Sequence, residues 1–352
     1  MSGAGGSVRG CPPPSYLSLS ARLAVNVEAA NMVEALGNVI RHRKATVVYK
    51  VGDRYDIKTV PVISGEAVRH ALQAALADIA SSKGLKVCEW CRRHEFVKHG
   101  VRPLLGDFEK RLNEAVSKGG LAAGERLVLE ECVVEDVGGF LVPVQQPVKR
   151  TSVVEVSYMI PALDRDGRLL YGFDVQFHTR HAPSAQQRLQ QVAGRREEEQ
   201  AQSVYNIESS SAVYALSLNV ELWRIGVVAT SNGCEVLQDR GERVRAALAA
   251  LAAVLNGDVR VGGHWSSYKP LWRLEGAVAV FSRPMPISAA PAVYYNFIEE
   301  TKRIAEAKAE IYKQTLGNFE YNVVVMEPDK AADFLKRLVE LGVKYAEGSP
   351  GR

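Results

Sequence analysis

Alternation of apolar and polar side chains along residues 21–28 is the feature that most limits what this chain can fold into. Its apolar and polar residues fall on opposite sides of an extended backbone, with Leu23, Val25 and Val27 facing one way and Arg22, Asn26 and Glu28 the other. Because side chains alternate across a strand with a period of two, the pattern predicts a half-buried strand with a polar outer face. The chain therefore needs a sheet with one covered side.

Further segments repeat this period and alternate with helical patterns. The predicted strands cover residues 46–50, 58–63, 132–137, 153–160, 169–179, 204–222, 274–281 and 321–325. The first predicted helix begins at Ser64, which suits the N-cap. Three more helices are predicted at residues 240–255, 296–315 and 329–341. The order strand, connection, strand and helix at the start of the chain is typical of an α+β sheet domain and predicts an α+β fold.

The length of 352 residues fits about two domains, or one domain with large insertions. We expect residues 1–15, which are rich in Gly, Ser and Pro, to form a disordered leader. The core is predicted to comprise residues 16–82 and 129–352, interrupted by a helical insertion at residues 83–128. Residues 183–202 have no sustained apolar pattern and are expected to form a flexible loop within the core.

Composition and missing motifs narrow the functional classes. An apolar fraction of 47% with 24% charged residues is typical of a globular protein, and the longest apolar run, Ala246–Leu255, is too short to cross a bilayer. We therefore expect a cytoplasmic protein that does not bind membranes. The sequence contains no GxxxxGK[ST], GxGxxG, HExxH or GxSxG motif, which disfavours nucleotide-driven chemistry and the common hydrolases.

Basic and amide-bearing residues cluster beside the predicted strands. The candidates for binding phosphates or bases are Arg22, Asn26, Arg41, His42, Arg43, Lys44, Ser64, Gly65, Lys149, Arg150, Gln176, His178 and Arg180. Arg and Lys match phosphate oxygens, a helix start such as Ser64-Gly65 offers free N–H groups, and a strand displaying Gln176, His178 and Arg180 suits RNA. Each segment has an ordinary alternative as a solvated loop or a capped helix. Together they favour an RNA-binding sheet that grips the backbone, although the aromatic signature of a standard RNA-recognition motif is missing.

The cysteines indicate no disulfide framework. Five cysteines, mostly scattered, in a chain of this length fit a reducing compartment. Cys88 and Cys91 form a CxxC pair that resembles half of a zinc site, but no second half has clean spacing, since His94 and His99 are very close in sequence and Cys132 is distant. We therefore predict no cofactor and keep the pair only as a weak metal candidate.

Seven blocks of sequence occur in an order that resembles a known family. They are ARLAVNVEAANMVEALGNVIRHRK, VPVISGEAVRHALQAALADIA, CVVEDVGGFL, VKRTS, SYMIPAL, DVQFHTR and VYNIESSSAVYALSL. Together they resemble the archaeal type I-A branch of the CRISPR-associated Cascade backbone proteins, the DevR-like group of the RAMP superfamily. The likeness runs from about residue 16 to about residue 222, and more loosely to the end.

The resemblance implies a modified ferredoxin-like (RRM-like) core with large insertions and the shape of a crescent or right hand. It implies a non-catalytic subunit that stacks head to tail with copies of itself along CRISPR RNA, beside other Cascade subunits. The guide is then presented for pairing with target DNA, so that base pairing supplies the specificity. By position, the candidate residues from Arg41–Lys44, Ser64-Gly65, Lys149-Arg150 and the 176–180 strand would line the RNA groove.

Two other functions remain open from the sequence. The first is a RAMP-type endoribonuclease that processes CRISPR precursor RNA with His178 as general base, which needs an acid and a cation at the same phosphate. The second is an interaction protein that binds no RNA and docks its partners through the C-terminal helices. The modest net charge of +4 is compatible with either alternative.

Overall fold

Strand β11 (Val204–Glu221) is the centre of the sheet because it pairs along both of its edges. The computed structural model describes residues 10–29, 32–36, 39–179, 204–262 and 269–348. On one edge β11 runs antiparallel to β1 (Tyr16–Glu28), from Tyr16 opposite Glu221 to Glu28 opposite Ser210. On the other edge it pairs with three shorter strands, β8, β9 and β10.

The remaining described elements extend this sheet or cover it. The other strands of the large sheet are β2 (Met32–Leu36), β3 (Val39–His42), β8 (Val154–Val156), β9 (Ile160–Pro161), β10 (Tyr171–Thr179), β14 (Leu271–Arg283) and β15 (Glu320–Val325). Separate hairpins are formed by β4 (Lys44–Val51) with β5 (Arg54–Pro61), β6 (Phe140–Val142) with β7 (Val148–Arg150), and β12 (Val227–Thr230) with β13 (Gly233–Val236). The helices are α1 (Gly65–Ser82), α2 (Glu89–Arg92), α3 (Asp107–Glu131), α4 (Val133–Gly138), α6 (Arg240–Asn256), α7 (Phe297–Leu316) and α8 (Ala331–Glu347), with short 3-10 turns at Arg102–Leu104 and Leu222–Arg224.

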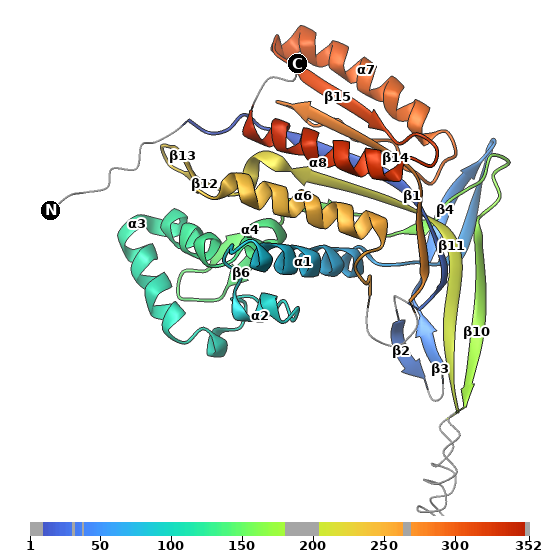
Figure 1. Ribbon diagram of the computed structural model, residues 1–352, viewed down its shortest axis with the longest axis horizontal. Helices are drawn as coiled ribbons and strands as arrows, with labels where there is room; N and C mark the ends of the chain where they lie inside the picture. Colours follow the sequence, from blue (N-terminus) through green and yellow to red (C-terminus); the bar gives the residue numbers. More distant parts are fainter. Residues whose placement is uncertain (1–9, 30–31, 37–38, 180–203, 263–268, 349–352) are drawn as a thin grey trace, which may run out of the picture.

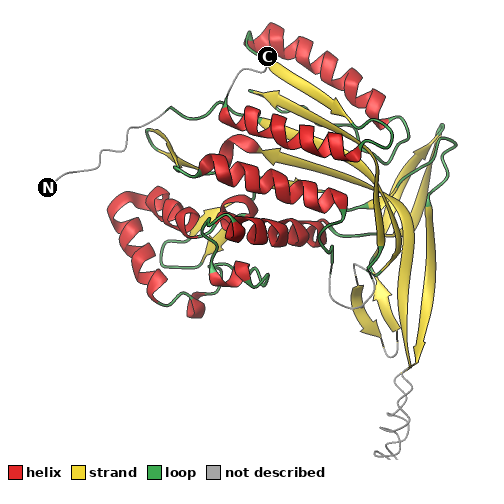
Figure 2. Cartoon of the chain, in the orientation of Figure 1, coloured by secondary structure: helices red, strands yellow, loops and turns green. Residues whose placement is uncertain are grey.

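Helices lie on both faces of the sheet, but unequally. α1, α6 and α8 lie side by side over one face, as the ribbon shows (Figures 1 and 2). The main core forms between this layer and the strands, from residues such as Leu19 of β1, Leu76 of α1, Leu248 of α6 and Leu338 of α8. α7 packs on the other face, where Val280 of β14 meets Ala305.

Most of the polar face of β1 is covered and only Asn26 of its predicted polar residues is exposed, which corrects the prediction of a half-buried strand. Ser18 and Ser20 are buried, and Arg22 is only 9% exposed. The segment that follows β14 lies over them: Ser18 accepts a hydrogen bond from the N–H of Ala289, and Arg22 donates to the carbonyl of Ala292. A sequence period shows which residues share a face, but not whether a distant segment covers that face.

The segment at residues 83–128 contains α2 and most of α3. α3 bends at Gly120, whose positive φ of 71° favours glycine. The strand predicted at Cys132–Val137 is wrong, since Val133–Gly138 is the helix α4. Cys132 takes the extended N-cap conformation, and Glu135 and Asp136 lie in the first turn, where acidic residues complement the helix dipole.

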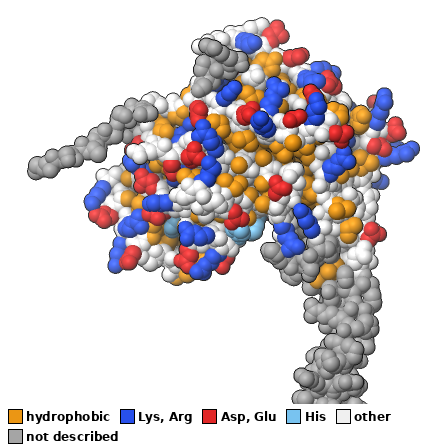
Figure 3. Space-filling model, viewed as in Figure 1, with side chains coloured by type: hydrophobic (Ala, Val, Ile, Leu, Met, Phe, Trp, Pro, Cys, Tyr) orange, Lys and Arg blue, Asp and Glu red, His pale blue; other side chains and the backbone are white. Residues whose placement is uncertain are grey.

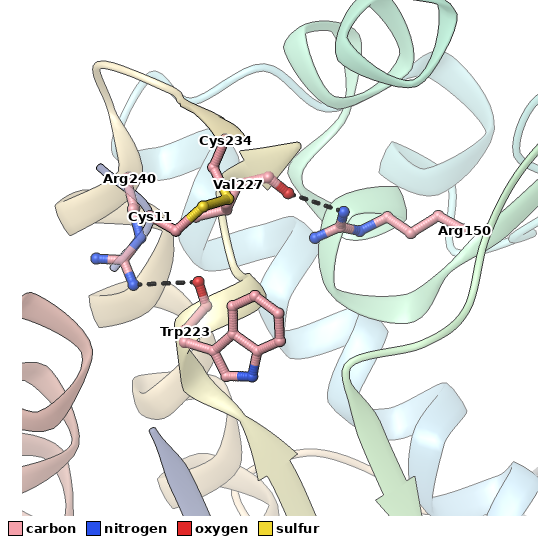
Figure 4. Close-up of a disulfide and its surroundings, with 6 residues drawn as sticks. All are labelled: Cys11, Arg150, Trp223, Val227, Cys234 and Arg240. Carbon is pink, nitrogen blue, oxygen red and sulfur yellow. Dashed lines mark hydrogen bonds between the residues drawn. A yellow bond between two sulfur atoms is a disulfide. The ribbon is translucent and has the colours of Figure 1, made fainter. Parts of the chain in front are cut away.

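The N-terminal residues that the structure describes are attached to the body. Cys11 forms a disulfide with Cys234 of β13, close to Trp223 (Figure 4), and Ser15 is buried. Residues 10–15 therefore depart from the disordered leader predicted from composition, and the bond departs from the prediction of a chain without disulfides. Among the described residues, no helix combines the length and apolarity needed to cross a membrane.

Candidate nucleic-acid interface

Paired strands project from one end of the sheet and carry the longest basic run of the sequence. β2–β3, β10–β11 and the β4–β5 hairpin lie together at this end, away from the helical segment that contains α2 and α3 (Figure 1). In the space-filling view, Lys and Arg side chains lie on this part as they do over the rest of the visible face, mixed with Asp and Glu (Figure 3). Arg41 and His42 end β3, and Lys44 begins β4, so the run lies where two strand pairs meet.

Lys44 connects two of these strand pairs. Its Nζ lies 3.9 Å from the ring centroid of Phe173 in β10 and 3.4 Å from Oε1 of Glu208 in β11. The Lys44 side chain remains 39% exposed. Because exposed ion pairs and cation–π contacts are worth only about 1 kcal/mol each, a phosphate could compete for this ammonium group.

Arg41 and Arg43 flank a buried histidine. Arg41 is exposed, and Arg43 is partly buried with its Nε unpaired within the part of the chain that the structure describes. Arginine side chains that reach the surface can bind a phosphate through two parallel hydrogen bonds. These two side chains and Lys44 make up what we call the basic strand end.

His42 has a structural role that the sequence did not reveal. Its Nε2 lies 2.5 Å from Oε1 of Glu28, and its Nδ1 lies 2.8 Å from the carbonyl oxygen of Arg43. Ser210 and Tyr214 also donate hydrogen bonds to Glu28 Oε1. Burial lowers the pKa of His42, but the hydrogen bond and charge of Glu28 outweigh it and raise the pKa overall. His42 therefore anchors β3 against β1 and is not open to RNA.

The His42–Glu28 pair predicts a pH-dependent stability. The folded pKa of His42 lies above its ordinary value of 6.5, so the pair contributes fully below pH 6.5 and its contribution is lost as the pH rises through the folded pKa. We expect Glu28→Gln to reduce this dependence and to cost about 1–3 kcal/mol at low pH, since the partner charge is removed. The measurement is the free energy of unfolding against pH, with Glu340→Gln on the exposed face of α8 as the control. Equal pH dependence in Glu28→Gln and wild type would contradict the assignment.

Two further candidates are exposed near this end. Asn26 lies at the end of β1 opposite Leu271, and Gln176 lies on β10 opposite Ile207. The backbone of His178 belongs to β10, opposite Tyr205, which places this residue farther along the same strand pair. Arg180 and the loop predicted at 183–202 lie outside the described residues.

Arg22, Ser64 and Gly65 hold the fold together in the structure. The guanidinium of Arg22 donates to the carbonyl oxygens of Ala292, Leu163 and Val293, and burial lowers its pKa. Ser64 caps α1 by accepting from the N–H of Ala67. A side chain on Gly65 would place its Cβ 2.5 Å from the carbonyl oxygen of Val156, so glycine is required there by close packing. Each of the three residues is buried, which leaves little room for an anion.

Lys149 and Arg150 are far from the basic strand end. They lie on β7, which pairs with β6 near α4, at the opposite end of the molecule from β3 and β10 (Figure 1). Lys149 is exposed, whereas Arg150 is buried. The structure therefore does not bring the predicted basic segments into one continuous patch.

Every nitrogen of the Arg150 guanidinium is already bonded. It donates to both the carbonyl and the carboxylate of Asp136, to Glu125, and to the carbonyl oxygens of Arg224 and Val227, the last drawn in Figure 4. A phosphate could reach this group only after these bonds break. We therefore assign Arg150 a structural role in place of the phosphate contact predicted from the sequence.

A second basic surface was missed by the sequence reasoning. The ring of Phe96 packs edge-on against His70 of α1, with centroids 4.8 Å apart, and Arg69 precedes His70 on this helix. Nε of Arg69 is buried and has no hydrogen-bond partner among the described residues. The neighbouring backbone has positive φ at His94, Phe96 and Lys98, a strained conformation that occurs often at functional sites. The helical period of α1 places Arg69 and His70 away from its apolar stripe, but the sequence does not show that Phe96 lies next to His70.

Exposed cations and amides on paired strands of an α+β sheet define a candidate nucleic-acid-binding protein. Residues 19–302 match the family described as CRISPR-associated negative auto-regulator DevR/Csa2. The chain is 33% identical to "CRISPR-associated aCascade subunit Cas7/Csa2 2" of Saccharolobus solfataricus, over 94% of this chain and 99% of the relative. It is 32% identical to "CRISPR-associated protein Cas7/Csa2 1" of the same organism, over 88% of this chain and 94% of the relative.

The chain belongs to the CRISPR-associated DevR/Csa2 family, which confirms the resemblance seen in the sequence blocks. A solved chain from a "CRISPR RNA-guided surveillance complex, pre-nicking" is also similar, with a TM-score of 0.47 and 13% identity over 93% of this chain and 100% of that chain. The family assignment rests on the sequence matches.

Proposed function

We propose that the chain is a non-catalytic, CRISPR RNA-binding backbone subunit of a type I-A Cascade-like complex in the cytoplasm. The observation that carries the proposal is the match along 94% of the chain to a relative named as an aCascade subunit. In this proposal, copies stack head to tail along the guide RNA, together with other Cascade subunits. The guide bases remain free to pair with target DNA.

The order of the core elements supports a modified ferredoxin-like fold as part of this proposal. Along the chain, β1 is followed by α1, the short strands β8 to β10, β11, α6 and β14. In the sheet, the order is β14, β1, β11 and then β8 to β10 on the far edge of β11. A strand–helix–strand–strand–helix–strand chain with its first and third strands in the centre is the arrangement expected of that fold. The projecting strand pairs and the helical insertion would then give the crescent or right-hand outline.

The proposed RNA contacts are those predicted side chains that are at least partly exposed. They are Asn26, Arg41, Arg43, Lys44, Lys149 and Gln176, with His178 as a candidate farther along β10 and Arg180 as a candidate outside the described residues. Contacts of this kind hold the phosphates and bases of a single strand without reading its sequence. Because Lys149 is at the other end of the molecule, the RNA would run along the body from one end to the other.

The test is to purify the full chain with and without co-expressed CRISPR RNA, and to size it before and after ribonuclease treatment. We expect large assemblies that contain RNA of guide length and that fall to small species when the RNA is digested. Assembly that survives digestion, with no bound RNA, would overturn the proposal in favour of an RNA-independent interaction protein. Cleavage of repeat RNA that is lost in His178→Ala would overturn its non-catalytic part.

A further inference from the structure

Three cysteines and one glutamate meet between α2 and α4, outside the proposed RNA contacts. The Sγ atoms of Cys88, Cys91 and Cys132 and a carboxylate oxygen of Glu135 all lie within 4.8 Å of one another. Cys91, Cys132 and Glu135 have no exposed surface, and Cys88 is partly buried. The CxxC pair therefore has the second half that its sequence neighbours did not supply, because the fold brings Cys132 to it from 41 residues along the chain.

The backbone holds these ligands from two separate segments. Cys88 is the N-cap of α2 and Cys132 is the N-cap of α4. The N–H of Val133 donates to the carbonyl of Lys86 over 3.0 Å, which ties the start of α4 to the residues just before Cys88. Cys91 lies one helical turn after Cys88, and Glu135 lies one turn after Cys132. Each segment thus presents two ligands from the first turn of a short helix.

The spacing suits a tetrahedral ion. Zinc–sulfur bonds of about 2.3 Å place the sulfur atoms of a tetrahedral site about 3.8 Å apart, so the observed cluster needs to contract by about 1 Å at most. A site with four protein ligands and no open position is typical of structural zinc. Soft thiolates also disfavour Mg²⁺ and Ca²⁺, which prefer oxygen ligands.

Neighbouring groups would support a bound ion. Nδ1 of His99 lies 2.7 Å from Oε1 of Glu135, which orients the carboxylate in the way that outer contacts orient metal ligands. The ammonium of Lys98 interacts electrostatically with Glu135, Cys91 and Cys132, and it donates to the carbonyl of Gly139. A cation beside the cluster offsets part of the negative charge that three thiolates and a carboxylate bring.

We propose that Cys88, Cys91, Cys132 and Glu135 bind one Zn²⁺ as a structural site. Binding displaces the thiol protons and forms three Zn–S bonds and one Zn–O bond, without any change in oxidation state. The ion joins the start of the helical insertion, at α2, to the point where the chain returns to the core, at α4. It therefore fixes the base of the insertion against α1, whichever partner the protein binds.

The test measures zinc in the purified full chain after dialysis against metal-free buffer. We expect about one zinc ion per chain, and a Co²⁺-substituted sample with the absorption of tetrahedral thiolate coordination. Cys132→Ser is expected to lose the metal, whereas the double variant Cys11→Ser/Cys234→Ser, which removes the other cysteines, is expected to retain it. His99→Ala should keep all ligands but bind zinc about 10- to 100-fold more weakly.

Several outcomes would overturn the site. They are a zinc content near zero with three free thiols, a disulfide between Cys88 and Cys91 in the purified protein, and the visible absorption of an iron–sulfur cluster. If Cys132→Ser does not fold, the Cys88→Ser variant at the partly exposed position and the Co²⁺ spectrum of the wild type decide the question. None of these readouts depends on RNA binding, so the site and the proposed function fail separately.

Discussion

Replacing Arg150 by alanine is expected to cost about 3–5 kcal/mol of folding stability, because the change leaves buried charges without their partner. Arg150 donates to Glu125 and Asp136, and its side chain is only 3% exposed. Asp136 keeps Arg243, 3.3 Å away, and the N–H of Gly226, but Glu125 and the carbonyls of Arg224 and Val227 lose their donor. The measurement is the free energy of unfolding from denaturant titration.

Lys149→Ala is the matched control. The two residues are adjacent on β7, but Lys149 points outward, so its loss is expected to change stability by no more than about 0.5 kcal/mol. The loss of stability in Arg150→Lys should lie between those of Arg150→Ala and Lys149→Ala, since lysine keeps the charge but not the forked geometry. An Arg150→Ala protein with wild-type stability and selectively weakened RNA binding would show that Arg150 acts on RNA and that the structural role is wrong.

The basic runs show where sequence reasoning reaches its limit. Local patterns indicated correctly that Arg41–Lys44 and Lys149-Arg150 accompany strands. Whether a charged side chain in such a run points outward depends on the face that the strand presents to a distant segment. His42 meets Glu28, and Arg150 meets Asp136, only when segments distant in the sequence come together. The density of basic residues in the sequence therefore does not distinguish cations in buried ion pairs from cations at the surface.

The secondary structure was predictable where patterns are long, and failed where they are short. β11 and α6 follow extended alternation or a full apolar stripe, and α6 is capped by Gly257 in the left-handed conformation that glycine adopts easily. Cys132–Val137 contains three β-branched valines in six residues, and so short an apolar run cannot separate strand from buried helix. In the structure, the N–H of Val133 donates to the carbonyl of Lys86, a contact that a local sequence pattern does not reveal.

The zinc proposal depends on the same kind of information. The CxxC pair is visible in the sequence, but His94 and His99 lie too close to it along the chain and Cys132 lies far from it, so the sequence offers no second half with clean spacing. The structure selects Cys132 and Glu135 instead, from the α4 segment that had been predicted as a strand. In a strand, Cys132 and Glu135 would point to opposite faces, whereas one helical turn brings both to the same ion. The error in secondary structure therefore hid the site.

The double variant Arg43→Ala/Lys44→Ala is expected to weaken RNA binding about 100-fold at low salt, because each side chain supplies a charge-assisted contact worth about a factor of ten. If both residues contact phosphates of a single strand, the slope of log affinity against log salt should fall by about 1.4. The loss should be similar for guides of different sequence, since the contacts are to the backbone. Fluorescence anisotropy with labelled CRISPR RNA over a series of salt concentrations measures both quantities.

The control is Lys336→Ala/Arg337→Ala, which removes the same two charges from the exposed face of α8. Net charge falls equally in both variants, so a general electrostatic effect would weaken binding by the same amount in each. A specific contact at the basic strand end predicts a large loss only in the first. Among the described residues, Lys44 gives up its contacts to Phe173 and Glu208, which are worth about 1 kcal/mol each, so the Lys44 change should affect folding little. The free energy of unfolding of the double variant measures what the partly buried Arg43 adds. Equal salt slopes for the two variants would show that the basic strand end is not part of the RNA interface. The α1 surface around Arg69 would then be the next candidate for the RNA contacts.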